Sequence, residues 1–297
     1  MKCDLCPRKC LVDRKKGEKG ICGQTENLKV ARAALHFWEE PCISGDAGSG
    51  AVFFSGCPLH CVFCQNENIA NGTVGKEISL ERLVDIFLEL QEKRANNINL
   101  VTPGHFVPQI VKALDQARRE GLTLPVVYNT SSYETVDTIK MLEGYVDIYL
   151  PDFKYMSPVL SKKYSHAPDY AEVAKAAIAE MVRQTGKAVF VNGDEDNLIL
   201  SGTIVRHLTL PGCMADSMQI LKYLHETYGD MIYISIMNQF TPLSNLEKYP
   251  ELNRRITDEE YETLVDYAID IGIENGFIQE GETAEESFIP EFDNEGV

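Results

Sequence analysis

The sequence predicts an α/β protein built around a partial barrel, a (β/α)6 arrangement of parallel strands and helices. Two observations support this fold class. From residue 51 onward, short apolar runs of strand length alternate with longer segments in which apolar residues recur at helical spacing. Repeated units of this kind imply parallel strands joined by right-handed crossovers. About six units are present, which is fewer than the eight of a closed barrel, and the 297 residues leave room for an appendage.

The elements follow in order along the chain. Residues 79–94 illustrate the helical pattern, because their apolar residues fall on one stripe. Residues 28–38 are expected to form a short strand followed by turns, and the glycine-rich residues 44–50 suit a close approach of the backbone to a ligand. The expected strands are residues 51–55, 97–102, 125–129, 145–150, 187–191, 204–210 and 231–236, and the expected helices are residues 79–94, 106–120, 133–142, 169–184, 217–228 and 258–273.

This pattern divides the chain into three parts. Residues 1–50 form a cysteine-rich segment, residues 51–276 form the barrel, and residues 277–297 form an acidic tail. The tail contains Phe288, Ile289 and Phe292 among its carboxylates. We therefore expect part of it to dock on the barrel instead of remaining fully solvated.

Composition narrows the classes of function. The formal net charge of −17 argues against nucleic-acid binding, which depends on cationic side chains that neutralise phosphates. No apolar run approaches the roughly 20 residues of a membrane span, and the N-terminus lacks the apolar core of a signal peptide. The sequence therefore predicts a cytoplasmic protein without nucleic-acid or membrane partners.

Three cysteines follow the first barrel strand directly. Cys57, Cys61 and Cys64 have the spacing C-x3-C-x2-C. Three thiolates would leave one iron of a four-iron cluster without a protein ligand, and an open position marks a reactive metal site. The spacing also allows a zinc knuckle with a ligand such as His60, or buried apolar cysteines. The strand that enters the loop and the aromatic Phe63 favour the open cluster.

A second group of cysteines lies near the N-terminus. Four cysteines within about twenty residues, with little around them to pack, hold a fold only through a metal. The metal could be zinc or a second iron–sulfur cluster, Cys42 could replace one ligand, and the alternative is a mobile arm with reduced thiols. These four residues are Cys3, Cys6, Cys10 and Cys22.

Polar residues gather where the predicted strands end, which is where barrel enzymes place their chemistry. Asp152, Lys154 and Arg206 are charged side chains beside apolar strands, so they need partners. A zwitterionic aminoacyl ligand with ribose hydroxyls would supply those partners. Thr102 and Asn129 also lie at strand ends, although ordinary turn chemistry accounts for each of them alone.

With these motifs together, the chain resembles the radical S-adenosylmethionine (SAM) enzymes. Within that family it is similar to the pyruvate formate-lyase activating enzymes of a branch with an N-terminal four-cysteine segment. The matching stretches cover nearly the whole chain and are residues 3–22, 43–50, 53–66, 102–108, 152–154, 206–211 and 288–293.

The resemblance implies that Cys57, Cys61 and Cys64 hold a [4Fe–4S] cluster whose open iron binds the amine and carboxylate of SAM. Electron transfer then cleaves this cofactor to a 5′-deoxyadenosyl radical. Thr102-Pro103-Gly104 replaces the Gly-Gly-Glu of activating enzymes, which leaves the contacts to the amine open. The implied cofactor-binding residues are Phe63 near the adenine, Thr102, Gly104, Asn129, Asp152, Lys154 at the carboxylate, Arg206 and Asn238.

The resemblance also implies an oxidoreductase that works anaerobically with an electron donor such as flavodoxin or ferredoxin. The leading hypothesis is activation of a glycyl-radical enzyme as partner. Radical modification of a small molecule or peptide is the alternative, which the departure at residues 102–104 and the extra cysteines favour. A third hypothesis is a non-catalytic protein that binds metal through both cysteine groups.

Overall fold

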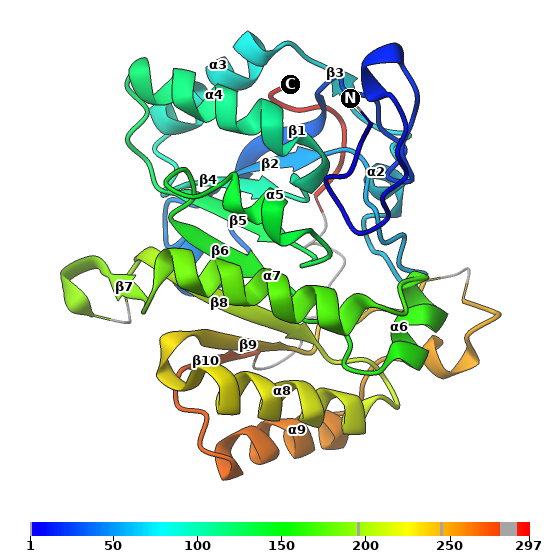
Figure 1. Ribbon diagram of the computed structural model, residues 1–297. Helices are drawn as coiled ribbons and strands as arrows, with labels where there is room; N and C mark the ends of the chain where they lie inside the picture. The colour runs from blue at the N-terminus through cyan, green and yellow to red at the C-terminus, as the bar shows by residue number, and fades with distance from the viewer. Residues whose placement is uncertain (1, 195–196, 244–245, 280–289) are drawn as a thin grey trace.

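A single ten-stranded sheet organises the computed structural model, which describes residues 2–194, 197–243, 246–279 and 290–297 (Figure 1). The strand order is β10-β9-β8-β6-β5-β4-β2-β1-β3, with β7 paired to β8 off this path. The strands are β1 Lys29–His36, β2 Ser49–Phe54, β3 Lys76–Glu77, β4 Ile98–Val101, β5 Val126–Thr130, β6 Ile148–Pro151, β7 Val189–Phe190, β8 Ile199–Leu208, β9 Tyr233–Met237 and β10 Gly276–Ile278.

The helices alternate with these strands from α3 onward. Side chains cap some of them, as where Ser79 accepts a hydrogen bond from the Arg82 amide at the start of α3. The α-helices are α1 Pro41–Ser44, α2 Glu67–Ala70, α3 Leu80–Glu92, α4 Val107–Arg119, α5 Val136–Lys140, α6 Pro158–Ser165, α7 Tyr170–Thr185, α8 Met214–Tyr228 and α9 Asp258–Asp270, and the 3-10 turns are η1 Arg14–Lys16, η2 Gly104–Phe106, η3 Val191–Gly193, η4 Gly229–Met231 and η5 Pro250–Leu252.

The sheet is mostly parallel and open, which confirms the predicted partial barrel. Each neighbouring pair from β2 through β4, β5, β6, β8 and β9 to β10 is parallel. Strands β1 and β3 add an antiparallel edge beside β2. The sheet therefore includes residues from both sides of the predicted boundary at residue 50, because β1 of the cysteine-rich segment pairs with β2. Parallel strands end at one common edge, so their following loops meet there.

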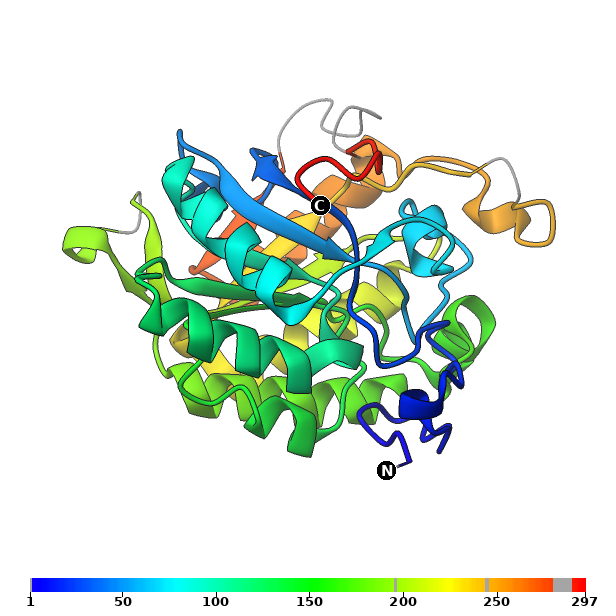
Figure 2. The same cartoon turned by 90° about the horizontal axis from the view of Figure 1, so that it is seen from above.

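Helices cover the outer face of this curved sheet (Figure 2). Near α3 and α4 the core contains buried residues such as Phe87, Leu114 and Leu100, and near α8 and α9 it contains Ile220, Leu264 and others. Burial of one apolar stripe from each helix stabilises this layer. The inner face of the sheet carries the polar and apolar residues that line the cavity described below.

Three local features differ from the expectation. The predicted strand 187–191 is only β7, and it pairs antiparallel with β8 as a hairpin instead of joining the parallel set. Helix α6 was not predicted, because its eight residues are too short to show a clear apolar period. At the second residue of β2, a Cβ on Gly50 would lie 2.7 Å from the Asn97 carbonyl oxygen. That glycine permits contact with the neighbouring strand, not with a ligand.

The described part of the acidic tail, residues 290–297, lies along β1. The Ala33 amide donates to the Glu295 carbonyl at 2.8 Å, and the Asn294 amide donates to the Ala31 carbonyl at 3.1 Å. The Phe292 ring contacts the Phe53 ring with centroids 5.4 Å apart. Phe288 and Ile289 lie outside the described residues. Within the described ranges, no helix has the length and apolar character needed to cross a bilayer.

Candidate active site

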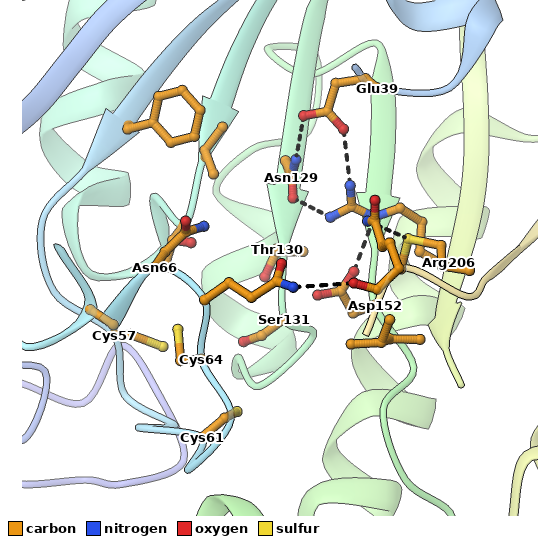
Figure 3. A pocket seen from close by; sticks show the side chains of 18 of the residues that line it. Glu39, Cys57, Cys61, Cys64, Asn66, Asn129, Thr130, Ser131, Asp152 and Arg206 are labelled. Atoms are coloured by element: carbon orange, nitrogen blue, oxygen red, sulfur yellow. Dashed lines mark hydrogen bonds and ion pairs between the residues drawn. The ribbon is translucent and has the colours of Figure 1, made fainter. Parts of the chain in front are cut away.

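The ends of the parallel strands surround a cavity of about 330 Å³ on the inner face of the sheet. Figure 3 shows side chains that line it, with Glu39, Asn129, Asp152 and Arg206 near one another. Its polar lining includes Glu39, Glu40, Asn66, Thr102, Asn129, Thr130, Ser131, Asp152, Lys154 and Arg206, and its apolar lining includes Phe53, Ile69, Val101, Leu208, Met237 and Pro290.

Cys57, Cys61 and Cys64 all line this cavity, and their side chains gather at one end of it in Figure 3. The Ser165 hydroxyl donates a hydrogen bond to the Cys61 sulfur at 2.9 Å. Burial raises the pKa of Cys57 to about 11 and that of Cys64 to about 12. Because bound cations lower the pKa of coordinating thiols, a metal would supply the charge that deprotonates these two.

The residues present fit an iron–sulfur cluster better than a single ion. Among the residues that the structure describes, no three His, Cys, Asp or Glu side chains are arranged to hold one metal ion. In a cluster each thiolate binds its own iron, so the sulfurs need not converge on one point. The His60 ring Nε2 lies 2.8 Å from the Ile21 carbonyl oxygen, and this contact already occupies the residue that a zinc knuckle would use.

The predicted charged residues form one buried network opposite the cysteines. Lys154 Nζ lies 2.7 Å from Asp152 Oδ2, and Arg206 Nε lies 3.0 Å from Asp152 Oδ1. Arg206 also contacts Glu39 Oε2 at 3.0 Å and Asn129 Oδ1 at 2.6 Å. The network brings together the ends of β5, β6 and β8 and the segment between β1 and α1 (Figure 3). Paired in this way, the charges can remain buried.

Asp152 and Lys154, which face the cysteines, lie so close together that each keeps the other in its charged form. Burial opposes the charge of Asp152, but Lys154 and Arg206 outweigh it and lower the carboxyl pKa. Burial likewise opposes the charge of Lys154, yet Asp152 keeps the ammonium pKa above its ordinary value. Lys154 also interacts electrostatically with Cys57 and Cys64. A cation is therefore held close to the cysteine end of the cavity.

The structure does not bring every predicted residue to this cavity. Phe63 packs in the core against Tyr155, Tyr164 and Phe240, and it is not among the cavity-lining residues. Asn238 is not among them either, and its backbone N–H donates a hydrogen bond to Gln279 Oε1 at 2.9 Å. Gly104 faces a separate, smaller cavity. Thr102 lines both cavities with a φ of 55°, a conformation uncommon for a β-branched residue.

Two site residues were missed by sequence reasoning. Glu39 accepts hydrogen bonds from Asn99, Asn129 and Arg206, and Glu40 is buried with one carboxylate oxygen unpaired. Both precede Pro41 in a segment expected to form turns. Two adjacent acids at the end of an apolar strand were the available signal, but nothing local pairs them with Arg206.

The four N-terminal cysteines lie around the smaller cavity, which has a volume of about 20 Å³. Its other lining residues include Pro58, Thr102, Gly104, Thr130 and Glu134. Because Thr102, Thr130 and Ser131 line both cavities, the two cysteine groups lie on opposite sides of one wall. The groups are Cys3, Cys6, Cys10 and Cys22 on one side, and Cys57, Cys61 and Cys64 on the other.

An open parallel sheet whose first barrel strand leads into three cysteines beside a charged cavity defines the class of cluster-dependent radical enzymes. The family model of the Radical SAM superfamily matches residues 51–197 of the chain. That superfamily consists of enzymes that use a [4Fe–4S] cluster and SAM, so the match supports these two as cofactors.

Comparisons with individual proteins agree with this fold. An uncharacterized protein of Methanocaldococcus jannaschii is 27% identical over 275 residues, which cover 90% of this chain and 74% of the relative. The structure of Streptococcus suis SuiB bound to S-adenosylmethionine aligns with a TM-score of 0.52 at 13% identity, covering 76% of this chain and 48% of SuiB.

HydG, a maturase of the [FeFe]-hydrogenase, aligns with a TM-score of 0.51 at 15% identity, covering 76% of this chain and 50% of HydG. Aligned regions therefore span about half the length of these two solved structures. Identities this low support the shared fold and leave the substrate to be proposed.

Proposed function

We propose that this protein cleaves SAM reductively at a [4Fe–4S] cluster held by Cys57, Cys61 and Cys64, and that the radical formed abstracts a hydrogen atom from a substrate. The observation that carries the proposal is the placement of three cysteines and the Asp152–Lys154 pair around one cavity. This cavity offers sulfur ligands at one end and a buried cation beside them. A cluster and a zwitterionic cofactor need both.

The bound cluster would supply the electron that cleaves the cofactor. The chain's own residues bind and orient: Lys154 meets the cofactor carboxylate, and Asp152 holds Lys154 and accepts ribose hydroxyls. Arg206 fixes Asp152 and Asn129, and is itself balanced by Glu39. Phe53, Val101, Leu208 and other apolar residues exclude water from the reacting centre.

The favoured substrate is a glycine residue in a glycyl-radical enzyme, which would make this protein its activase. The cavity of about 330 Å³ lies at the lower end of the range for small-molecule sites. Once a cofactor of SAM's size is bound, little room remains for a separate substrate. A backbone C–H on a loop of a partner protein needs only a narrow entrance, and a carrier such as flavodoxin or ferredoxin would donate the electron.

Radical modification of a small molecule or peptide is the second candidate. Two features favour it. Thr102-Pro103-Gly104 stands where activating enzymes have Gly-Gly-Glu, and Gly104 faces the smaller cavity. The N-terminal cysteines, as ligands of zinc or a second cluster, would add a centre for a task beyond simple activation.

One anaerobic experiment tests the function. The protein is reconstituted with iron and sulfide, reduced, and mixed with SAM, and 5′-deoxyadenosine is measured. We expect visible iron–sulfur absorbance and cofactor cleavage. A protein that binds zinc alone and forms no 5′-deoxyadenosine would overturn the proposal.

A second step separates the two substrate classes. Candidate glycyl-radical enzymes are added, and the glycyl radical is sought by electron paramagnetic resonance. A radical on the partner supports the activase role. Cleavage stimulated by a metabolite or peptide, without a partner radical, supports the alternative.

A further inference from the structure

The N-terminal cysteine segment contacts the catalytic cysteine loop at three separate points. The Arg8 guanidinium donates to the Pro58 carbonyl at 2.9 Å. The His60 ring lies 2.8 Å from the Ile21 carbonyl oxygen. Gly56 lies so close to Cys22 that a Cβ there would be 2.5 Å from the Cys22 carbonyl oxygen. The loop between Gly56 and Cys61 is therefore braced by residues that lie among the N-terminal cysteines.

Arg8 extends this contact to a catalytic sulfur. Its other two donors reach the carbonyls of His166 at 2.6 Å and Ser165 at 3.0 Å, and its guanidinium lies 5.1 Å from the Tyr133 ring centroid. The fully buried Ser165 donates its hydroxyl to the Cys61 sulfur. Arg8 thus fixes the backbone of the residue that hydrogen-bonds Cys61.

The backbone around Arg8 is held in an unfavourable conformation. Lys9 and Leu11, which flank Cys10, have φ values of 39° and 54°. Residues other than glycine seldom adopt such a conformation, and keep it only where the surroundings enforce it. Leu11 is half exposed and buries little apolar surface. Backbone hydrogen bonds from the Lys9 amide to the Cys6 carbonyl at 3.0 Å and from the Leu11 amide to the Cys3 carbonyl at 3.1 Å hold these turns, and a metal on the cysteines would hold them further.

The four thiols lie close enough for a shared centre. All four line the same cavity, and a Cβ on Gly20 would lie 3.2 Å from the Cys10 sulfur and 3.5 Å from the Cys22 sulfur. The sulfurs do not converge on one point, so a single ion would draw them inward, whereas a cluster would bind each thiolate at its own iron.

We infer that Cys3, Cys6, Cys10 and Cys22 bind a second thiophilic metal centre, a zinc ion or an iron–sulfur cluster, and that this centre holds the catalytic loop in place through Arg8. The inference rests on the proposed function in one respect, because it assumes that the braced loop carries the catalytic cluster. Arg8 and Ser165 are positioning residues: they act through Cys61 and touch no substrate.

Metal binding is tested first, in a way that is independent of the catalytic cluster. In the Cys57→Ala/Cys61→Ala/Cys64→Ala variant, zinc and iron per chain are counted after anaerobic purification and after reconstitution. We expect one zinc or one cluster per chain. Adding Cys3→Ser and Cys22→Ser should remove it. A triple variant that holds neither metal would overturn the second centre and leave the proposed function untouched.

The coupling is tested in protein with intact cysteines. Arg8→Gln should retain the N-terminal metal, while hydrogen exchange in residues 57–64 rises by at least about tenfold, because three hydrogen bonds from a charged donor are lost. The reduction potential of the catalytic cluster should fall, because hydrogen bonds to cluster sulfurs stabilise the reduced form. Ser165→Ala should also lower the reduction potential of the catalytic cluster. The potential of Arg8→Lys should lie between those of Arg8→Gln and the wild type.

Lys9→Gln is the matched control, because Lys9 is an exposed neighbour of the same charge. It should change neither exchange nor potential. If Arg8→Gln shows the same hydrogen exchange in residues 57–64 and the same cluster reduction potential as the wild type, the coupling is overturned, even if the second metal is present.

Discussion

Glu39 and Arg206 form an ion pair with a distance of 3.0 Å inside the barrel, although 167 positions separate them in the chain. The same arginine also binds Asp152, which in turn holds Lys154. One residue from the segment after β1 therefore balances the charge of the whole strand-end network. Without it, two cations would be buried against the single carboxylate of Asp152 and the strongly buried Glu40, whose pKa is raised mainly by burial.

Glu39→Ala is expected to destabilise the protein by about 1.5–3 kcal/mol, the range for a hydrogen bond to a charged group. The loss should be smaller than that for a buried charge with no partner, because Arg206 retains its hydrogen bonds to Asp152 and Asn129. The free energy of unfolding by urea measures it. Glu143→Ala removes an exposed partner of Arg183 and should cost less than about 1 kcal/mol. Equal losses for the two variants would contradict a special role for Glu39.

Cys57→Ala is expected to lower the iron bound at the catalytic site after anaerobic reconstitution, with loss of cofactor cleavage. One missing thiolate leaves two irons of the cluster without a protein ligand. Iron content and visible absorbance measure the result. Cys213→Ala is the control: Cys213 is buried among apolar residues and is not among the lining residues of either cavity. Full cluster content in Cys57→Ala would rule out the assignment.

Much of this site was predictable because its residues follow strands directly. Asp152, Lys154 and Arg206 could be chosen from sequence, since parallel strands end at a common edge and buried charges need partners. The cysteine loop could be proposed from its spacing together with the strand that enters it and Phe63, because the spacing alone also allowed a zinc knuckle. These features are local, because each of them can be recognised from the residues at or directly after a single predicted strand.

Glu39 could not be found in this way. Its partners come from β4, β5 and β8, and it precedes all three in the chain. The contact between Arg8 and the turn at Ser165 is equally non-local. Phe63 shows the converse limit: its motif position predicted a contact with the adenine, which stays a prediction, and its packing against three aromatic rings could not be read from the motif.

Lys154→Gln is expected to weaken SAM binding by roughly ten- to a hundredfold, which corresponds to the loss of one charge-assisted hydrogen bond of about 1.5–3 kcal/mol. The cluster should still form, because the cysteines are unchanged. Isothermal titration of the reconstituted protein measures the affinity. Lys163→Gln, which removes an exposed lysine paired with Glu251, should bind SAM like the wild type. Unchanged affinity in Lys154→Gln would exclude the carboxylate contact.

Glu134 provides a test based on pH. Glu134 is a buried residue that lines the smaller cavity, and its carboxyl accepts hydrogen bonds from Tyr128 at 2.9 Å and Thr130 at 2.7 Å. Burial outweighs these bonds and raises its pKa from 4.5 to about 7. Between these two pH values the folded protein binds more protons than the unfolded chain, so this group makes the free energy of unfolding fall as pH rises. Well below pH 4.5 this group does not lower the free energy of unfolding, and well above pH 7 it lowers it by no more than about 3.4 kcal/mol.

Glu134→Gln removes this titration while keeping the shape of the side chain. The variant should therefore gain stability relative to the wild type as pH rises from 5 to 8, with most of the gain complete near pH 7. Urea unfolding of both proteins across this range measures the difference, in which the titrations of other groups largely cancel. A difference that stays constant with pH, or that moves in favour of the wild type, would show that Glu134 is ionised in the folded protein throughout the range.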